Sequence, residues 1–176
     1  MKERSMFTKT RSFAIGLLIS TAIAGAAHAE VPSPTPVPGL PAEFSAVASF
    51  YQSALTVNAK TTASEVLATV LSDSFQSVNI EGIEDRAALT AQIEHFWTLV
   101  PNLRWDIQEV IVAGDQVVVR SIASGSPKGN FFGLELDGSK SFRIDTIDIH
   151  TLRDGKIETV HHVEGWATAM QQLTAK

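Results

Sequence analysis

Acidic and imidazole side chains occupy two segments near the end of the chain, with Asp148 and His150 in one and His162 and Glu164 in the other. Both segments are predicted strands, and residues two apart on a strand share a face. A tight turn joins the two strands, which makes them neighbours. Counting outward from that turn places position 148 opposite about position 161. His162 is therefore predicted one position away from Asp148, an offset that a bulge or a slightly longer turn would correct.

A carboxylate beside an imidazole can carry out acid/base chemistry. The carboxylate orients the ring, fixes its tautomer and raises its pKa, while the ring exchanges a proton near neutral pH. We therefore predict Asp148 and His162 as a catalytic pair. His150, Glu164 and Arg120 are candidate binding residues that would assist it.

Three alternatives to this interpretation stay open. His161 and His162 could form an exposed pair on an edge strand, solvated by neighbouring glutamates. Asp148 lies in a strand of apolar pattern, so it must be paired in a pocket, salt-bridged or turned outward. Arg120 could pair with Asp145 or Asp148 instead of contacting a ligand.

The residue types predict neither a metal nor a cofactor. Adjacent histidines on a strand point to opposite faces, so His161 and His162 cannot both bind one ion without distortion. The sequence has no Gly-rich phosphate-binding motif and no nucleophile elbow. It also has no cysteine, which excludes iron–sulfur clusters, thiol catalysis and a disulfide scaffold. The net charge of −5 and the lack of a basic patch argue against nucleic acid as a partner.

The spacing of apolar residues predicts the helices and strands that position these side chains, and it changes along the chain from a helical to a strand pattern. Apolar residues at spacings of three and four predict helices over 42–58, over 64–71, and from an N-cap at Asp85 to just before Pro101. Alternation predicts strands at 75–80, 103–112, 116–124, 142–152 and 156–164, before a helical tail at 166–173. Helices followed by antiparallel strands indicate an α+β class, with the helices on one face of a curved sheet.

The first 29 residues have the features of a secretory signal peptide. A basic start and a short apolar run lead to Ala27-His28-Ala29, which predicts cleavage after Ala29. The apolar run is shorter than the roughly 20 residues of a membrane span, so we expect a periplasmic or secreted protein without stable membrane insertion. Cleavage would leave a net charge of −8. Residues 30–41 contain five prolines and predict an extended linker, which places the folded domain at 42–176.

An ordered set of short motifs resembles a known family. The motifs are Gly-Asp-Gln-Val-Val-Val-Arg at 114–120, Gly-Asn-Phe-Phe-Gly-Leu at 129–134, Ile-Asp-Ile at 147–149 and Leu-Arg-Asp-Gly-Lys-Ile at 152–157. Together they resemble the SnoaL-like polyketide cyclase or ester cyclase family, within the nuclear transport factor two-like superfamily. The resemblance extends over roughly residues 44–173.

This resemblance implies a cone-shaped barrel of a strongly curved antiparallel sheet, with N-terminal helices packed across it. It also implies a polar pocket lined by the last two strands, where relatives carry His or Asp at the position of Asp148. At His162 the cyclases tend to carry an acidic residue, so the acid and the imidazole are exchanged in this chain. Relatives often have an acidic residue where Gly165 stands, and Glu164 is its nearest substitute here.

Family members of known chemistry are similar in using a cofactor-free mechanism, in which an acid/base pair moves a proton beside a carbonyl during aldol-type ring closure. The resemblance therefore implies cyclisation or isomerisation of a small apolar carbonyl compound. Phe131 and Phe132, in a loop that resembles the family's lid, would line the pocket, or they would be core residues or dimer contacts. Trp97 and Tyr51 would be core residues or line the cavity as well. The alternatives are a small-molecule-binding protein without turnover, or a structural module that forms a homodimer through the outer face of the sheet.

Overall fold

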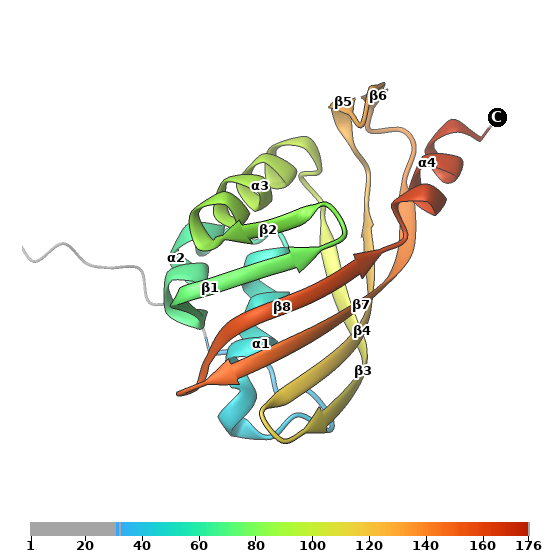
Figure 1. Ribbon diagram of the computed structural model, residues 1–176. Helices are drawn as coiled ribbons and strands as arrows, with labels where there is room; N and C mark the ends of the chain where they lie inside the picture. Colours follow the sequence, from blue (N-terminus) through green and yellow to red (C-terminus); the bar gives the residue numbers. More distant parts are fainter. Residues whose placement is uncertain (1–30, 32, 176) are drawn as a thin grey trace, which may run out of the picture.

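The computed structural model describes residue 31 and residues 33–175 (Figure 1). The predicted signal peptide, residues 1–29, lies outside the described residues. The described part of the proline-rich segment is tied to the domain, because the backbone of Thr35 exchanges two hydrogen bonds of 2.7 and 2.9 Å with the Gln52 side chain. Within the described residues, no helix is both long and apolar enough to cross a bilayer.

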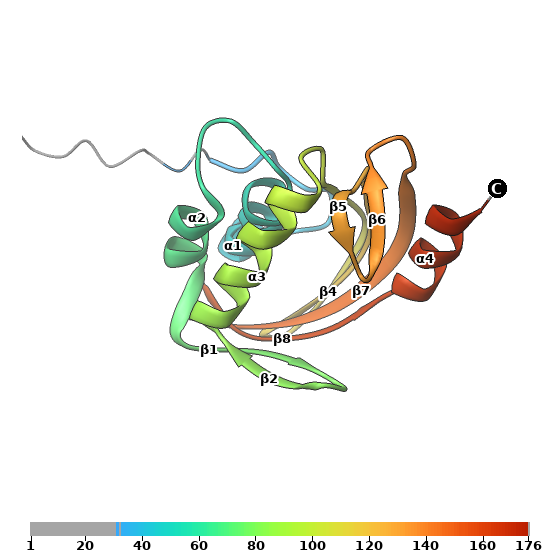
Figure 2. The same ribbon diagram turned by 90° about the horizontal axis from the view of Figure 1, so that it is seen from above.

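A strongly curved sheet forms the body of the domain (Figures 1 and 2). In spatial order its strands are β2 (Gly82–Asp85), β1 (Leu71–Asn79), β8 (Lys156–Glu164), β7 (Phe142–Arg153), β4 (Gln116–Gly125) and β3 (Arg104–Ala113). β1 and β8 run parallel, and the other neighbours run antiparallel. Within the described residues 33–175, the two edge strands β2 and β3 do not pair with each other. The expected barrel is therefore an open, mixed sheet. The α+β class is confirmed.

Helical segments cover the concave side of this sheet, as Figure 2 shows. They are η1 (Ala42–Phe44), α1 (Ser45–Ser49), η2 (Phe50–Leu55), α2 (Ala63–Val70) and α3 (Arg86–Leu99), while α4 (Trp166–Thr174) packs against β7 at the far end. The predicted N-cap of α3 is confirmed, since the Asp85 carboxylate accepts a 2.8 Å hydrogen bond from the Ala88 amide. The first predicted helix ends instead as the π-helical turn η2.

Two short hairpin elements were not predicted. One is β2, which is only four residues long and contains Gly82 and two acidic residues, so it has little strand signal. The expected Gly-rich lid loop is a second, two-stranded sheet of β5 (Lys128–Phe131) and β6 (Leu134–Asp137). At its tip Phe132 and Gly133 have φ angles of 48° and 83°, the left-handed values of a tight hairpin turn.

The burial pattern of β7 places polar groups inside the molecule. Alternate residues from Phe142 to Leu152 face the concave side and are buried. Three consecutive members of these six inward residues are polar: Thr146, Asp148 and His150. The outward residues between them, Ile147 and Ile149, are 51% and 37% exposed. This inversion of the usual pattern of apolar inside and polar outside marks the concave face of β7 as the place to look for a functional site.

Candidate functional site

The pairing of β7 with β8 places Asp148 directly opposite His162. An irregularity in the register between Thr151 and Leu152 shifts the pairing by one position, which is the correction that the sequence count required. β8 lies between β1 and β7, so it is not an edge strand. His161 is exposed on the outer face, whereas His162 faces inward, and this arrangement excludes the alternative of an exposed histidine pair.

Tyr51 brings the helical layer into contact with this pair of strands. It belongs to η2, is fully buried, and donates a short hydrogen bond from its hydroxyl to Oδ2 of Asp148. The same hydroxyl lies 3.0 Å from Nε2 of His150. π-Helical turns are frequent at functional sites. Asp148 is therefore a buried carboxyl held from the helix side, and neither the outward nor the salt-bridged alternative applies.

His162 is held on both sides of its ring. Its Nδ1 lies 2.6 Å from Oε1 of Glu164, two residues along the same strand face, and its Nε2 lies 3.0 Å from the Ser77 hydroxyl of β1. The side chains of His162 and Glu164 are 16% and 17% exposed, whereas Asp148 is only 4% exposed. The site therefore opens toward solvent through His162 and Glu164.

Burial dominates the electrostatics of Asp148. It raises the pKa of the carboxyl from 3.8 to about 7, and the negative charge of Glu164 adds to the increase. The hydrogen bond from Tyr51 and the charge of His162 act in the opposite direction but do not cancel the effect of burial. A carboxyl with a pKa near 7 can both accept and return a proton at neutral pH.

The pKa values of the two histidines on the inner face shift in opposite directions. The hydrogen bond that His162 donates to Glu164 raises the pKa of His162, and the charges of Glu164, Asp148 and Glu84 support the increase against the effect of burial. Burial lowers the pKa of His150 from 6.5 to about 3, with a further contribution from the charge of His162. His162 is thus the more readily protonated of the two, and His150 is neutral at physiological pH.

Only some of the other predicted site residues lie beside Asp148 and His162. His150 and Glu164 join Asp148 and His162, as described above. Arg120 does not, because strand alternation turns it to the outer face, where it pairs with Glu109 at 3.3 Å and with Asp145 at 3.9 Å. The structural pairing with Asp145, which the sequence left open, is the one observed. Trp97 is partly buried in the helical layer and donates a 3.0 Å hydrogen bond to the carbonyl of Ala54.

Phe131 and Phe132 belong to an aromatic cluster at the end of β8. Its members are in ring-to-ring contact at centroid distances of 4.8–6.2 Å and include Phe96 of α3, Phe142 of β7 and Trp166, two residues after Glu164. Phe131 is buried and Phe132 is largely exposed. The cluster gives the end of the sheet beside Glu164 an apolar surface.

Sequence reasoning missed Ser77 and the role of Trp166. Ser77 is buried on β1 and reaches His162 only because β1 pairs in parallel with β8. A lone serine in a short predicted strand carries no signal of that contact. Trp166 was placed on the closing helix, but its contact with the Phe131–Phe132 turn depends on the unpredicted hairpin β5–β6.

Three side chains of the site could in principle approach a cation. Each of them offers one ligand atom, and these three atoms, from Asp148, His162 and Glu164, lie within 4.8 Å of one another. A cation on His162 would displace one of its two hydrogen bonds, because a ring nitrogen that holds a proton cannot also ligate a metal. The arrangement therefore fits a hydrogen-bonded acid/base cluster better than a metal centre.

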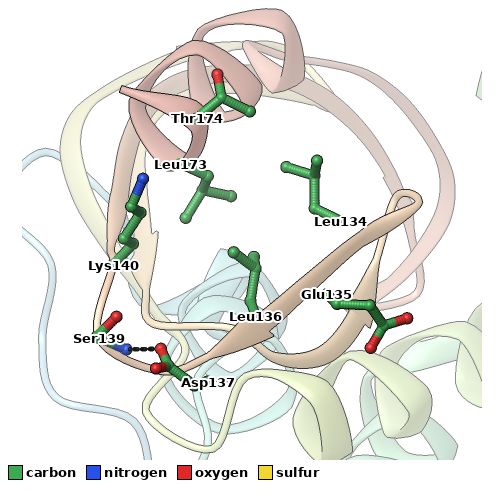
Figure 3. Close-up of a pocket in the computed structure, with 8 residues that line it drawn as sticks. All are labelled: Leu134, Glu135, Leu136, Asp137, Ser139, Lys140, Leu173 and Thr174. Carbon is green, nitrogen blue, oxygen red and sulfur yellow. Dashed lines mark hydrogen bonds between the residues drawn. The ribbon is translucent and has the colours of Figure 1, made fainter. Parts of the chain in front are cut away.

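A separate hollow of about 520 Å³ lies between the hairpin β5–β6 and α4. Figure 3 shows Leu134, Leu136 and Leu173 pointing toward one another across it, with Lys140 at the rim. The ammonium group of Lys140 donates a 2.6 Å hydrogen bond to the carbonyl of Ala175. No residue of the Asp148 cluster lines this hollow.

Comparison with known proteins identifies the family. The model of the SnoaL-like polyketide cyclase family matches residues 45–173, from the start of α1 to one residue before the end of α4. The chain belongs to this family. The predicted resemblance is confirmed, and the SnoaL-like family is one of small-molecule proteins of the cyclase and isomerase type. No curated protein matches the sequence.

Solved structures support the fold of this SnoaL-like chain. A candidate SnoaL-like polyketide cyclase from Jannaschia sp. CCS1 is 20% identical with a TM-score of 0.66, over 76% of this chain and 92% of that one. The candidate polyketide cyclase IdmH from Streptomyces antibioticus is 18% identical with a TM-score of 0.65, over 76% and 99%. One from Bacillus cereus ATCC 10987 is 24% identical with a TM-score of 0.60, over 82% and 93%. At these identities the likeness concerns the fold and not the reaction.

Proposed function

We propose that this SnoaL-like protein catalyses cofactor-free proton transfer beside the carbonyl group of a small apolar compound, leading to aldol-type cyclisation or isomerisation. The observation that carries the proposal is the buried Asp148 carboxyl, with a pKa of about 7, directly opposite His162. The aromatic cluster beside Glu164 supports an apolar substrate, because it supplies apolar surface next to a few convergent polar groups.

In the proposed mechanism the ionised Asp148 removes a proton from the carbon next to the substrate carbonyl. The C–H bond breaks, its electron pair forms an enolate, and the proton moves to the carboxylate. The imidazolium of His162, oriented by Glu164, stabilises the negative charge of the enolate. In cyclisation the enolate carbon then attacks a second carbonyl of the same molecule, and the resulting alkoxide takes the proton back from Asp148. In isomerisation the proton returns to a different carbon.

Exchange of carbon-bound hydrogen for deuterium tests this proposal without knowledge of the natural substrate. The purified protein is incubated in D₂O with apolar 1,3-dicarbonyl compounds, and loss of the proton signal is followed by NMR. We expect exchange to be faster than in buffer alone. The Asp148→Asn variant should lose about 10²–10⁴-fold of the protein-dependent rate, the usual contribution of a positioned base.

Asp145→Asn is the matched control for that assay. Asp145 lies on the same strand but on the outer face, paired at 3.9 Å with Arg120, so its substitution removes an equal charge without touching the site. Exchange should persist in this variant. Compounds that bind to the protein with no exchange above background, or equal rates in Asp148→Asn and wild type, would contradict the proposed reaction and favour a binding protein.

We further propose that two copies of the chain associate through the outer face of the sheet. The register places an apolar row across all six strands, interrupted only by His161; it consists of Ile83, Val78, His161, Ile149, Val118 and Ile111. Ile147 and Val163 extend it, and both are exposed. Arg120, Glu109 and Asp145 beside the row carry both signs of charge, so this face is complementary to a second copy of itself.

Substitution of Ile149 by glutamate should convert the dimer into a monomer, because Ile149 is in the middle of the apolar row and a charge buried there would be unpaired. The mass is measured by size-exclusion chromatography with light scattering. Ile80→Glu is the control, since Ile80 is fully exposed at the tip of the β1–β2 hairpin, off the row. A wild-type monomer at all accessible concentrations would contradict the association.

A further inference from the structure

Tyr51 is the only tyrosine of the chain and makes two hydrogen bonds inside the site. Its hydroxyl has a single proton, whereas both Oδ2 of Asp148 and Nε2 of His150 lie within hydrogen-bonding reach. Only one of these contacts can use the tyrosine proton. The direction of the other contact must therefore be set by its own partner.

Counting protons fixes both directions when Asp148 is ionised. A carboxylate has no proton to donate, so the hydroxyl of Tyr51 must donate to Asp148. The 3.0 Å contact with His150 then requires a proton on Nε2, with the tyrosine oxygen as acceptor. Because His150 is neutral, its Nδ1 carries a lone pair. Nδ1 is also one of the two buried side-chain polar atoms in the described part of the chain that have no hydrogen-bond partner.

The two carboxylate oxygens of Asp148 differ in their hydrogen bonds. Its Oδ2 accepts from Tyr51, whereas within residues 33–175 no hydrogen bond reaches Oδ1. The ring of His150 is itself fixed by edge contacts, at centroid distances of 5.6 Å, with Phe50 and Tyr51. The buried side chains of His150 and Tyr51 thus direct their hydrogen bonds to Oδ2 of Asp148 alone, and Oδ1 remains able to accept a proton from a substrate.

We propose that His150 and Tyr51 are positioning residues that act in series on Asp148: His150 donates from Nε2 to Tyr51, Tyr51 donates to Oδ2, and Oδ1 is left to receive the substrate proton. The catalytic meaning of this chain rests on the function proposed above. The chain itself is a property of the protein without substrate. It explains why a neutral histidine with one unpaired nitrogen is kept in the interior of the site.

Each link of the chain has a measurable consequence for Asp148. The hydrogen bond from Tyr51 lowers the pKa of the carboxyl, so its removal should raise that pKa further. A hydrogen bond to a charged group is worth roughly 1.5–3 kcal/mol, which corresponds to about one to two pH units. Loss of the His150 donor weakens the Tyr51 hydroxyl as a donor, so it should produce a smaller shift in the same direction.

NMR spectroscopy of the substrate-free full chain tests the proposal. In protein labelled with ¹⁵N at histidine, we expect His150 to be protonated at Nε2 alone at pH 8, where Asp148 is ionised. In protein labelled with ¹³C at the aspartate carboxyl, we expect the midpoint of Asp148 to rise by about one pH unit or more in Tyr51→Phe. In His150→Phe it should rise by less, and His150→Gln should restore it toward wild type, because glutamine can donate an N–H to Tyr51.

Ser121→Ala is the control for loss of a buried hydroxyl. Ser121 faces the interior and its hydroxyl bonds to that of Thr146 at 2.6 Å, so it is not a member of the His150–Tyr51–Asp148 series of hydrogen bonds. The midpoint of Asp148 should therefore stay at its wild-type value. If Tyr51→Phe does not fold, the two His150 variants decide the question. Protonation of His150 at Nδ1 at pH 8, or equal midpoints in His150→Phe and His150→Gln, would overturn the proposal. Because these spectra need no substrate, they are independent of the deuterium-exchange assay that tests the proposed function.

Discussion

Asp148→Asn is expected to be more stable than the wild-type protein above pH 7 by up to about 4 kcal/mol. Burial raises the pKa of Asp148 from 3.8 to about 7, so above pH 7 the folded protein must hold a buried charge that the unfolded chain exposes to water. Asparagine has the same shape, carries no charge, and its carbonyl oxygen can still accept the hydrogen bond from Tyr51. The substitution therefore removes the cost while it keeps the contact.

The stability difference should depend on pH in a defined direction. Below about pH 4 the carboxyl is protonated in both the folded and the unfolded protein, so the advantage of asparagine should vanish there. It should grow between pH 4 and 7 and then level off. Urea denaturation of both proteins at a series of pH values measures it, and Asp145→Asn controls for the loss of a charge. An Asp148→Asn variant that is less stable than wild type at pH 8 would contradict the account.

His150 is expected to destabilise the folded protein in acid. Burial lowers the pKa of His150 from 6.5 to about 3, so below pH 6.5 the unfolded chain binds a proton that the folded protein does not. Stability should be lost as the pH falls from 6.5 toward 3, by up to about 5 kcal/mol for this group alone. Asp148 acts with the opposite sign over much of the same range, so the wild-type curve shows only the difference between the two.

Comparison with His150→Gln isolates this effect. The stability of the variant relative to wild type should increase steadily as the pH falls below 6.5. His95→Gln serves as the control, because His95 is exposed on α3 and belongs neither to the site nor to the apolar row of the sheet. If the relative stability of His150→Gln is the same at pH 4 and pH 7, His150 is not held neutral in the folded protein.

The strands that carry the site could be predicted because their periodicity is strong. The boundaries of β8 are those predicted, 156–164, and β7 differs from its prediction by one residue at its end. Asp148 and His162 could be paired from the sequence because a tight turn fixes the neighbouring strands. The remaining uncertainty of one position came from an irregularity between Thr151 and Leu152, which is a backbone feature without a residue signature.

The contacts that complete the site come from distant segments, and local patterns do not encode them. Tyr51 is separated by 97 residues from Asp148, and its aim depends on the π-helical turn η2 in a segment that looks like an ordinary amphipathic helix. Ser77 reaches His162 through the parallel pairing of β1 with β8, which a predicted antiparallel meander does not contain. The outward position of Arg120 follows from strand alternation, but the face could be assigned only once the neighbours of β4 were known.

The carboxyl titration of Asp148, followed by ¹³C NMR and assigned by its absence in Asp148→Asn, tests the central claim most directly. The account predicts a midpoint near pH 7, because burial outweighs the hydrogen bond from Tyr51 and the charge of His162. A midpoint near 7 would establish a carboxyl that can accept and return a proton at neutral pH. A midpoint near 4 would mean that the carboxyl is solvated and ionised at every physiological pH, and it would contradict the proposed acid/base role.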